Sequence, residues 1–305
     1  MINRSLLVGI VLFTIYSLVI NLKPKLSSTQ HQWQDNIAKA QNYVFNESDT
    51  LNNIIIGSSL SCRILTDSLP SFYNLSFNGQ GIFDGLKIIK NKHNLPKNIF
   101  IETNVILRKE NSDFTSSLLF PISFYLRKHL LSLRADKQPI SILLRYLKIK
   151  NHQPNEIKNN IKLSTKSNEF YKNISKIKTT ENLNFRNGNT FDNMFKMQIT
   201  EYSKQPNKET LNEQLLLLTE YVKYMKSNGV RVCFFEMPVN NKLMELPKAR
   251  TIRNEIYKHF PKNEYDYILP DSSEYVTTDG CHLNTIESIK YTTYFRTQLK
   301  KHKFF

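Results

Sequence analysis

The sequence predicts an α/β fold in which a parallel sheet is covered by helices on both faces. Short, continuous apolar runs alternate with segments of helical periodicity near the start of the chain and again near its end. Strands that are apolar throughout, rather than at every second residue, are typical of a parallel sheet that is buried on both sides. A length of 305 residues, of which 40% are hydrophobic, is sufficient to bury such a core.

The expected elements follow this alternation in both halves of the chain. In the first half we expect strands at 53–56, 72–77 and 98–102, with helical segments at 60–69 and 81–92 between them. In the second half we expect a helix at 210–226, strands at 230–236 and 267–269, and a closing helix at 286–300. The first of these helices ends before Asn228-Gly229, which is a common C-terminal signal.

An uncharged apolar stretch at 6–20 predicts a helix that crosses a membrane. Arg4 precedes the stretch, and Lys23 and Lys25 follow it. At 1.5 Å per residue the helix is about 25 Å long, which is just enough to span a bilayer. No small-residue cleavage pattern follows, so we expect an uncleaved single-pass anchor within 1–26, with a cleaved signal peptide or a core helix as the alternatives.

The short amino tail before the anchor favours one orientation. Basic residues flank both ends of the apolar stretch, so the positive-inside rule gives nearly a tie. A tail of a few residues with the folded mass after it favours an amino terminus inside and the bulk of the chain outside. In a bacterial cell this corresponds to the inner membrane, with the main domain on the periplasmic or extracellular side.

After the anchor we expect a helical stalk at 27–48 and a main domain at 49–305, which a basic insertion at 108–198 interrupts. The chain carries a net charge of +16, and from 114 to 198 fifteen Lys and Arg stand against five Asp and Glu. We expect the insertion to be mostly helical. Its helices either pack on the core with a solvated basic face or contact anionic lipid. Without zinc-finger spacing, RNP-like aromatic motifs or a Gly-rich phosphate loop, the charge predicts no nucleic-acid partner.

The cysteines predict neither a metal site nor a cofactor. Cys62, Cys233 and Cys281 have no metal-ligand spacing. A disulfide between Cys62 and Cys281 and free thiols both stay open at this point.

Two short stretches carry the candidate chemistry. The first apolar run ends at Gly57 and leads into Ser58-Ser59, and Asp279 stands three residues before His282, ahead of the closing helix. A serine hydroxyl needs a base within hydrogen-bond reach to act as a nucleophile, and a carboxylate orients that base. A serine where a strand gives way to a helix also leaves backbone N–H groups for an oxyanion. Each stretch alone also fits an ordinary helix cap.

Taken together, these blocks resemble the SGNH, or GDSL-like, hydrolase superfamily. In that family a glycine after the second strand and an asparagine after the third complete the oxyanion hole. Here Asn78-Gly79 and Asn104 stand at those places, in the expected order. The resemblance covers about 50–107 and 208–300, and it implies a flavodoxin-like three-layer α/β/α sandwich.

The resemblance also implies a role for each matching residue. These are Ser59 as the nucleophile, His282 as the base, Asp279 as its orienting acid, and Ser59, Gly79 and Asn104 as the oxyanion hole. Ser58 stands where the family has an aspartate, so it stays open as the alternative nucleophile. The usual Gly-x-Asn-Asp around the asparagine is Glu-Thr-Asn-Val here.

A Gly-Ser-Ser variant behind an amino-terminal anchor is similar to the envelope subset of this superfamily. Those proteins are the alginate and D-alanine transfer components that work beside membrane-bound O-acyltransferases. The resemblance implies a membrane-anchored enzyme that O-acetylates a cell-envelope polysaccharide through an acyl-serine, with an acyl donor, a glycan acceptor and a membrane-bound O-acyltransferase as partners. Two alternatives stay open: a carbohydrate acetylesterase with the same triad, and a non-catalytic glycan-binding or scaffold protein.

Overall fold

A computed structural model describes residues 2–22, 32–46, 51–69, 71–139, 142, 189–271 and 273–304. The chain divides into two compact units. One combines 1–46 with 112–167, and the other combines 47–111 with 168–305. Residues 140–141 and 143–188 of the predicted basic insertion lie outside the described residues.

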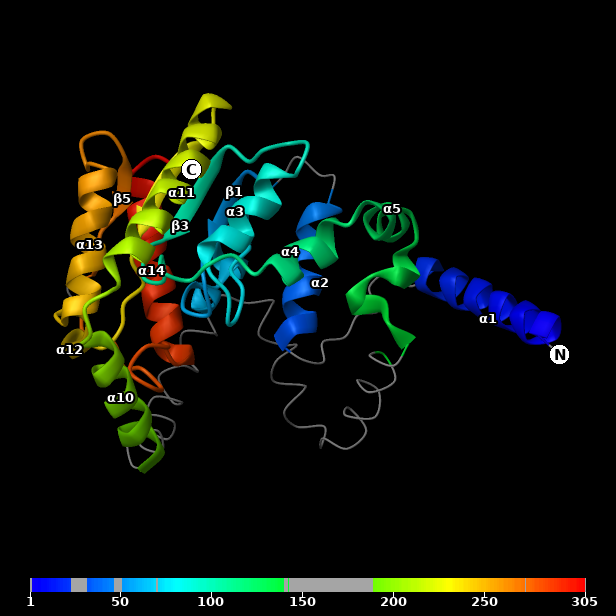
Figure 1. The fold of residues 1–305 in the computed structure, drawn as a ribbon, viewed down its shortest axis with the longest axis horizontal. Helices are drawn as coiled ribbons and strands as arrows, with labels where there is room; N and C mark the ends of the chain where they lie inside the picture. Colours follow the sequence, from blue (N-terminus) through cyan, green and yellow to red (C-terminus); the bar gives the residue numbers. More distant parts are fainter. Residues whose placement is uncertain are drawn as a thin grey trace. The chain divides into compact units, whose positions relative to one another are not determined.

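The larger unit is built on a five-stranded, all-parallel sheet (Figure 1). Its strands are β1 (Asn53–Ile56), β2 (Phe72–Asn74), β3 (Asn98–Glu102), β4 (Arg231–Phe235) and β5 (Asp266–Ile268). They are ordered β2-β1-β3-β4-β5, and each pair of neighbours is parallel. The strands at 72–77 and 230–236 are shorter than the sequence predicts, while 53–56 and 98–102 match.

Helices flank both faces of this sheet. They are α3 (Ile82–Lys90), α10 (Asn189–Tyr202), α11 (Lys208–Ser227), α12 (Asn241–Met244), α13 (Pro247–His259) and α14 (Thr285–Lys301). Figure 1 shows α3, α11 and α13 side by side, and α11 contacts both of the others. Parallel neighbours need a long crossover connection, which is usually a helix, because a short turn cannot bring the chain back to the same end of the sheet.

Alternate residues of the strands build the two halves of the core. The rings of Phe100 and Phe235 both pack edge-on against the ring of Phe295 of α14, with centroids 5.9 and 5.3 Å apart. The preceding residue of β4, Phe234, turns to the other face and packs on Phe260, which caps α13. All five rings are buried, so the continuous apolar runs in the sequence reflect burial on both faces.

The helix predicted at 60–69 is wrong. This segment contains only two short 3₁₀ turns, η1 (Ser61–Arg63) and η2 (Thr66–Ser68). Ile64 between them is extended, with φ −74° and ψ 122°, and the Asn74 side chain donates to the carbonyls of Ser61 and Ile64. Serine, threonine and aspartate in this stretch favour such local bonds over helix interior positions.

The smaller unit contains the apolar helix and the start of the insertion. Its elements are α1 (Ile2–Leu22), α2 (Gln32–Val44), α4 (Ser112–Leu119), α5 (Pro121–His129) and the 3₁₀ turns η3 (Leu131–Leu133) and η4 (Ala135–Lys137). The helix α2 lies in the predicted stalk, yet it buries Ala40, Gln41 and Tyr43 and contacts α4 and η4. The stalk region and the start of the insertion therefore pack together in one unit, while α10, at the end of the insertion, packs on α12 and α13 in the sheet unit.

The helix α1 is apolar and mostly exposed to its surroundings. Its residues Arg4–Leu22 have a mean hydropathy of 2.2, and only 6% of this segment is buried. Among the described residues it is the one helix that is long and apolar enough to cross a membrane. Both a membrane anchor and a signal sequence have these properties.

Candidate active site

The candidate site lies at the carboxyl ends of β1 and β3. The strand order places β2 on one side of β1 and β3 on the other, so the loops after β1 and β3 run in opposite directions. This divergence opens a crevice at the carboxyl end of the sheet, which is where ligands bind in open α/β folds. Ser59 stands three residues after β1, and Asn104 stands two residues after β3.

Three of the predicted side chains form a hydrogen-bonded chain. The Ser59 Oγ lies 2.8 Å from the His282 Nε2, and the His282 Nδ1 lies 2.7 Å from the Asp279 Oδ2. An ionised carboxylate only accepts, so Nδ1 carries the proton and donates it to Asp279. The Nε2 lone pair is then directed at the Ser59 hydroxyl, which is the arrangement that activates a serine.

The loop that carries Asp279 keeps this carboxylate ionised. Burial of Asp279 raises its pKa, but hydrogen bonds from the His282 ring and from the backbone N–H groups of His282 and Cys281 outweigh burial and lower the pKa to about 2. The loop closes through a bridge between Thr277 and Leu283. Asp279 is therefore a fixed negative charge against the imidazole.

The structure separates the two serines that the sequence left as alternatives. Ser58 is fully buried, and its hydroxyl donates to the Glu102 carboxylate at 2.8 Å. Ser59 is partly exposed and lines a cleft together with His282. Only the Ser59 hydroxyl is both beside the base and open to a substrate.

Glu102 is a residue that the sequence analysis missed. This carboxylate, at the end of β3, is fully buried and accepts from the backbone N–H groups of Ser58 (2.9 Å) and Ser61 (3.2 Å) and from both of their hydroxyls. It binds the turn after β1 through four donors. The available signal was an acidic residue that ends an otherwise apolar strand, since a buried carboxylate requires such partners.

One backbone N–H group in this turn has no acceptor among the described residues. The N–H groups of Ser58 and Ser61 go to Glu102, and that of Leu60 goes to the Ser58 Oγ. Within the described part of the chain, the N–H of Ser59 donates to no acceptor. A nucleophile whose own N–H is unused provides one donor of an oxyanion hole.

The other two predicted oxyanion donors differ in their surroundings. Gly79 lies in an exposed turn with φ 75°, outside the residues that line the cleft. Asn104 does line the cleft. Its Oδ1 accepts from the Met237 N–H at 2.7 Å, and its Nδ2 donates to the Met237 carbonyl at 2.9 Å. This pair of bonds fixes the amide and occupies one of its two N–H groups.

The cleft at Ser59 is large and has a polar rim. It encloses about 400 Å³, and its lining includes Arg108, Gln198, Glu201, Tyr202 and Lys248. Lys248 pairs with Glu201 at 2.7 Å, whereas Arg108 has no acidic partner among the described residues and donates one N–H to the Gln80 carbonyl. The rim therefore has an unpaired positive charge.

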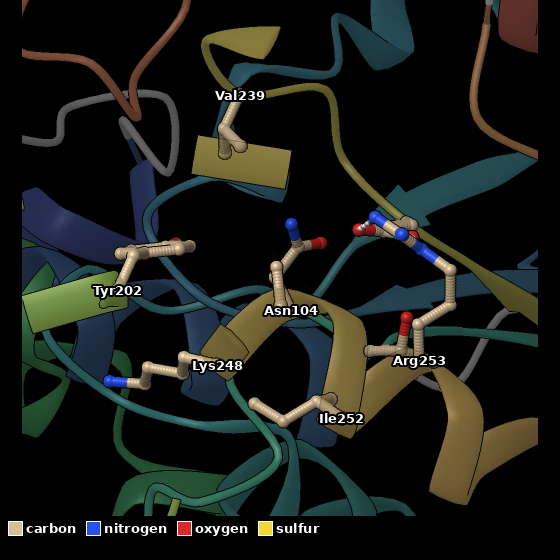
Figure 2. A pocket seen from close by; sticks show the side chains of 9 residues that line it. Asn104, Tyr202, Val239, Lys248, Ile252 and Arg253 are labelled. Atoms are coloured by element: carbon tan, nitrogen blue, oxygen red, sulfur yellow. Dashed lines mark hydrogen bonds and ion pairs between the residues drawn. The ribbon is translucent and has the colours of Figure 1, made fainter. Parts of the chain in front are cut away.

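A second, much smaller cavity adjoins the cleft. It shares Asn104, Tyr202 and Lys248 with the cleft, and Figure 2 shows Asn104 between Tyr202 and the Arg253 side chain. Arg253 is held by a bidentate bond to Glu236, with both distances 2.8 Å. The cavity encloses about 20 Å³, which is room for roughly one water molecule.

Replacing Gly57 with alanine is expected to destabilise the sheet unit by about 3 kcal/mol or more, because the turn has no space for a side chain. An added Cβ would lie 2.0 Å from the Ser61 Oγ and 2.4 Å from the Glu102 Oε2. Thermal unfolding of the native chain and of Gly57→Ala measures the difference in their unfolding free energies. Gly229→Ala is the matched control: φ there is 77° but no atom lies within 4 Å, so a cost of about 1 kcal/mol is expected. Equal losses in the two variants would contradict a role for the Glu102 contacts.

The described residues contain no group of three or more His, Cys, Asp or Glu that would hold a metal ion. Cys62, Cys233 and Cys281 are free thiols, and burial raises the pKa of Cys281 to about 12. No protein-family model, curated protein or solved structure matches this chain.

Proposed function

We propose that this chain is a membrane-anchored serine acyl-transfer enzyme that O-acetylates a cell-envelope polysaccharide through an acyl-serine. The observation that carries the proposal is the chain of hydrogen bonds from Ser59 through His282 to Asp279, at the edge of an open cleft. A helix cap would explain a serine or an aspartate alone. It would not explain a nucleophile, a base and an ionised acid in contact.

The fold and the site together support membership of the SGNH-like superfamily with a flavodoxin-like sandwich. The strand order β2-β1-β3-β4-β5 is the one expected of a flavodoxin-like doubly wound sheet. The four sequence blocks follow β1, β2 and β3 and precede α14, as the family pattern requires. Glu102 also supplies a buried carboxylate beside Ser58, the position at which the family aspartate is missing.

In the first step the Ser59 Oγ attacks the carbonyl carbon of an acyl donor, and the Ser59 proton moves to the His282 Nε2. The oxygen of the tetrahedral intermediate develops a negative charge, which the Ser59 N–H stabilises together with a second donor. Within the described residues, the fixed amide of Asn104 has one N–H without an acceptor, which is available for this purpose. The intermediate collapses when His282 gives its proton to the leaving group, and the acyl group stays on Ser59.

In the second step a hydroxyl group of the acceptor attacks the acyl-serine. His282 takes the hydroxyl proton and returns it to the Ser59 Oγ as the new ester leaves. The polar rim of the cleft supports a saccharide as this acceptor, since amide, phenol and charged side chains match sugar hydroxyls. The unpaired charge of Arg108 favours a glycan that carries acidic groups.

The proposed location is the inner membrane of a bacterial cell, with the enzyme facing the periplasm or the exterior. The exposed apolar helix α1 supports an anchor. A membrane-bound O-acyltransferase is the proposed partner that would deliver the acyl group, because acyl donors are made on the other side of such a membrane.

Trapping the acyl-enzyme tests the proposal. The purified full chain is mixed with an activated acetyl ester, quenched in acid and analysed by peptide mass spectrometry. We expect one acetyl group on the peptide that contains Ser59, and faster loss of this group when a polysaccharide acceptor is added than in buffer alone. Loss at the same rate with and without acceptor would indicate the acetylesterase. No adduct with any ester would contradict both enzymes and favour a binding protein.

A further inference from the structure

One face of α5 is apolar and exposed. Ile122, Tyr125 and Leu126 stand at positions i, i+3 and i+4, and they are 66%, 64% and 40% exposed. On another side of the helix, Phe124 packs against Phe45 of the same unit, with ring centroids 5.2 Å apart. A stripe at this spacing normally faces a protein core, so its exposure indicates an apolar neighbour outside the described part of the chain.

The charge of α5 is concentrated at its carboxyl end. Arg127, Lys128 and His129 form the last turn, and the first turn contains no acidic residue. Phe120, which directly precedes the helix, is a further exposed apolar side chain, with 57% of its surface accessible. Exposed apolar side chains followed by a basic turn are typical of helices that lie in the surface of an anionic membrane.

The same unit packs against α1 at a point well inside that helix. The turn η3 contacts both α1 and α5. The Ser17 Oγ lies 2.8 Å from the Ser132 Oγ of η3, and the Tyr16 hydroxyl donates to a backbone carbonyl of η4. Tyr16 precedes Leu22, the last residue of α1, by six residues. At 1.5 Å per residue, the Tyr16 contact lies about 9 Å from the carboxyl end of α1, which is about 30 Å long.

We propose that α5 and η3 lie in the surface of the bilayer that α1 crosses. Ile122, Tyr125 and Leu126 then contact the lipid acyl chains, and Lys128 lies at the level of anionic head groups. The depth of the η3 contact on α1 fits this level, because about 9 Å below the end of a spanning helix is within the roughly 5–10 Å to which interfacial helices bury their apolar face. The inference rests on the proposed anchor and adds a second, parallel attachment that holds the unit against the membrane.

Fluorescence quenching by brominated lipids tests this placement in the full chain. The background is Trp33→Phe, which removes the single native tryptophan. One tryptophan is then introduced as Ile122→Trp on α5, as Phe13→Trp on α1, or as Leu216→Trp on α11, where Leu216 is 63% exposed. Each protein is reconstituted into phosphatidylcholine vesicles that carry bromine either near the head or near the end of the acyl chain.

We expect the Ile122→Trp probe to lose fluorescence and shift to the blue, with stronger quenching by bromine near the head. The Phe13→Trp probe should be quenched most by bromine near the chain end, and the Leu216→Trp probe by neither. The inference would be overturned if the Ile122→Trp probe, like Leu216→Trp, is quenched by neither brominated lipid. This is also the result expected if a protein partner covers this face. If the Phe13→Trp probe is also unquenched, the proposed anchor fails together with the inference. If the Phe13→Trp probe alone is unquenched, the anchor fails, and the placement of α5 beside a spanning α1 is overturned although α5 still contacts lipid.

The charge at the end of α5 is tested in the same assay. Adding phosphatidylglycerol to the vesicles is expected to increase quenching of the Ile122→Trp probe, and Lys128→Gln is expected to remove part of this increase. Lys223→Gln, on an exposed position of α11, is the matched control and should leave it unchanged. An equal response to the anionic lipid in both variants would overturn the role of Lys128 at the head groups.

Discussion

Ser59→Ala is expected to reduce turnover of an acetyl ester by about five to six orders of magnitude, because the variant has no nucleophile beside its base. The hydroxyl that it removes is the one 2.8 Å from the His282 Nε2. Residual turnover should remain above the uncatalysed rate, since the oxyanion donors and the cleft still bind the substrate. Steady-state hydrolysis of a chromogenic acetyl ester measures the loss, and the acetyl adduct should be absent from the trapped protein.

Ser58→Ala is the matched control for this experiment. It removes a hydroxyl of the same size one residue away, but this hydroxyl is buried and donates to Glu102. We expect a loss of stability of about 1 kcal/mol and turnover within roughly tenfold of the native enzyme. Native turnover in Ser59→Ala, or its complete loss in Ser58→Ala alone, would reverse the assignment of the nucleophile.

Asp279→Asn is expected to lower turnover by about four orders of magnitude while the fold is retained. An asparagine keeps an oxygen for the backbone N–H groups of Cys281 and His282, which now bind the Asp279 Oδ1. Its amide N–H, however, would face the His282 Nδ1 and favour the tautomer with the proton on Nε2. That proton would be directed at Ser59 and prevent His282 from acting as a base. A decrease of less than about tenfold would argue that Asp279 has only a structural role.

The same carboxylate predicts how stability depends on pH. The pKa of Asp279 is about 2 in the folded protein, below the value of 3.8 for an unperturbed aspartate. A lowered pKa in the folded state means that the stabilisation is complete above about pH 4 and is lost as the pH falls toward 2. We expect this to contribute about 1 to 2 kcal/mol at neutral pH. Denaturant unfolding between pH 2 and pH 6 should show this component in the native chain and lack it in Asp279→Asn.

The strands and the order of the site could be predicted because each depends on a local pattern. The apolar runs that became β1 and β3 were found at their observed ends, since burial on both faces makes a strand continuously apolar. Ser59, Asp279 and His282 could be proposed as candidates from the sequence because a nucleophile, a base and an acid require particular residue types. The geometry brings these three side chains together within hydrogen-bond distance.

What was not predicted depends on contacts between distant segments. The segment 60–69 has helical spacing, but bonds from Asn74 and from the N–H and hydroxyl of Ser61 to Glu102 hold it in separate turns. The polar pattern of α2 suggested a stalk, and its burial becomes visible only with α4 and η4 in place. Residue patterns along one segment do not specify partners that are 41 or 94 residues away, such as Glu102 for Ser61 and Ala135 for Gln41, so these features required the folded chain.

The proposed nucleophile, Ser59, and its base, His282, lie 223 residues apart in the polypeptide. A chain still being synthesised or exported would present Ser59 long before the loop with His282 could reach it. Such an intermediate has a serine hydroxyl without a base and is chemically silent. If the proposed location is correct, acyl transfer begins only when the last part of the chain has emerged from the membrane and folded, which protects acyl donors inside the cell from a half-made enzyme.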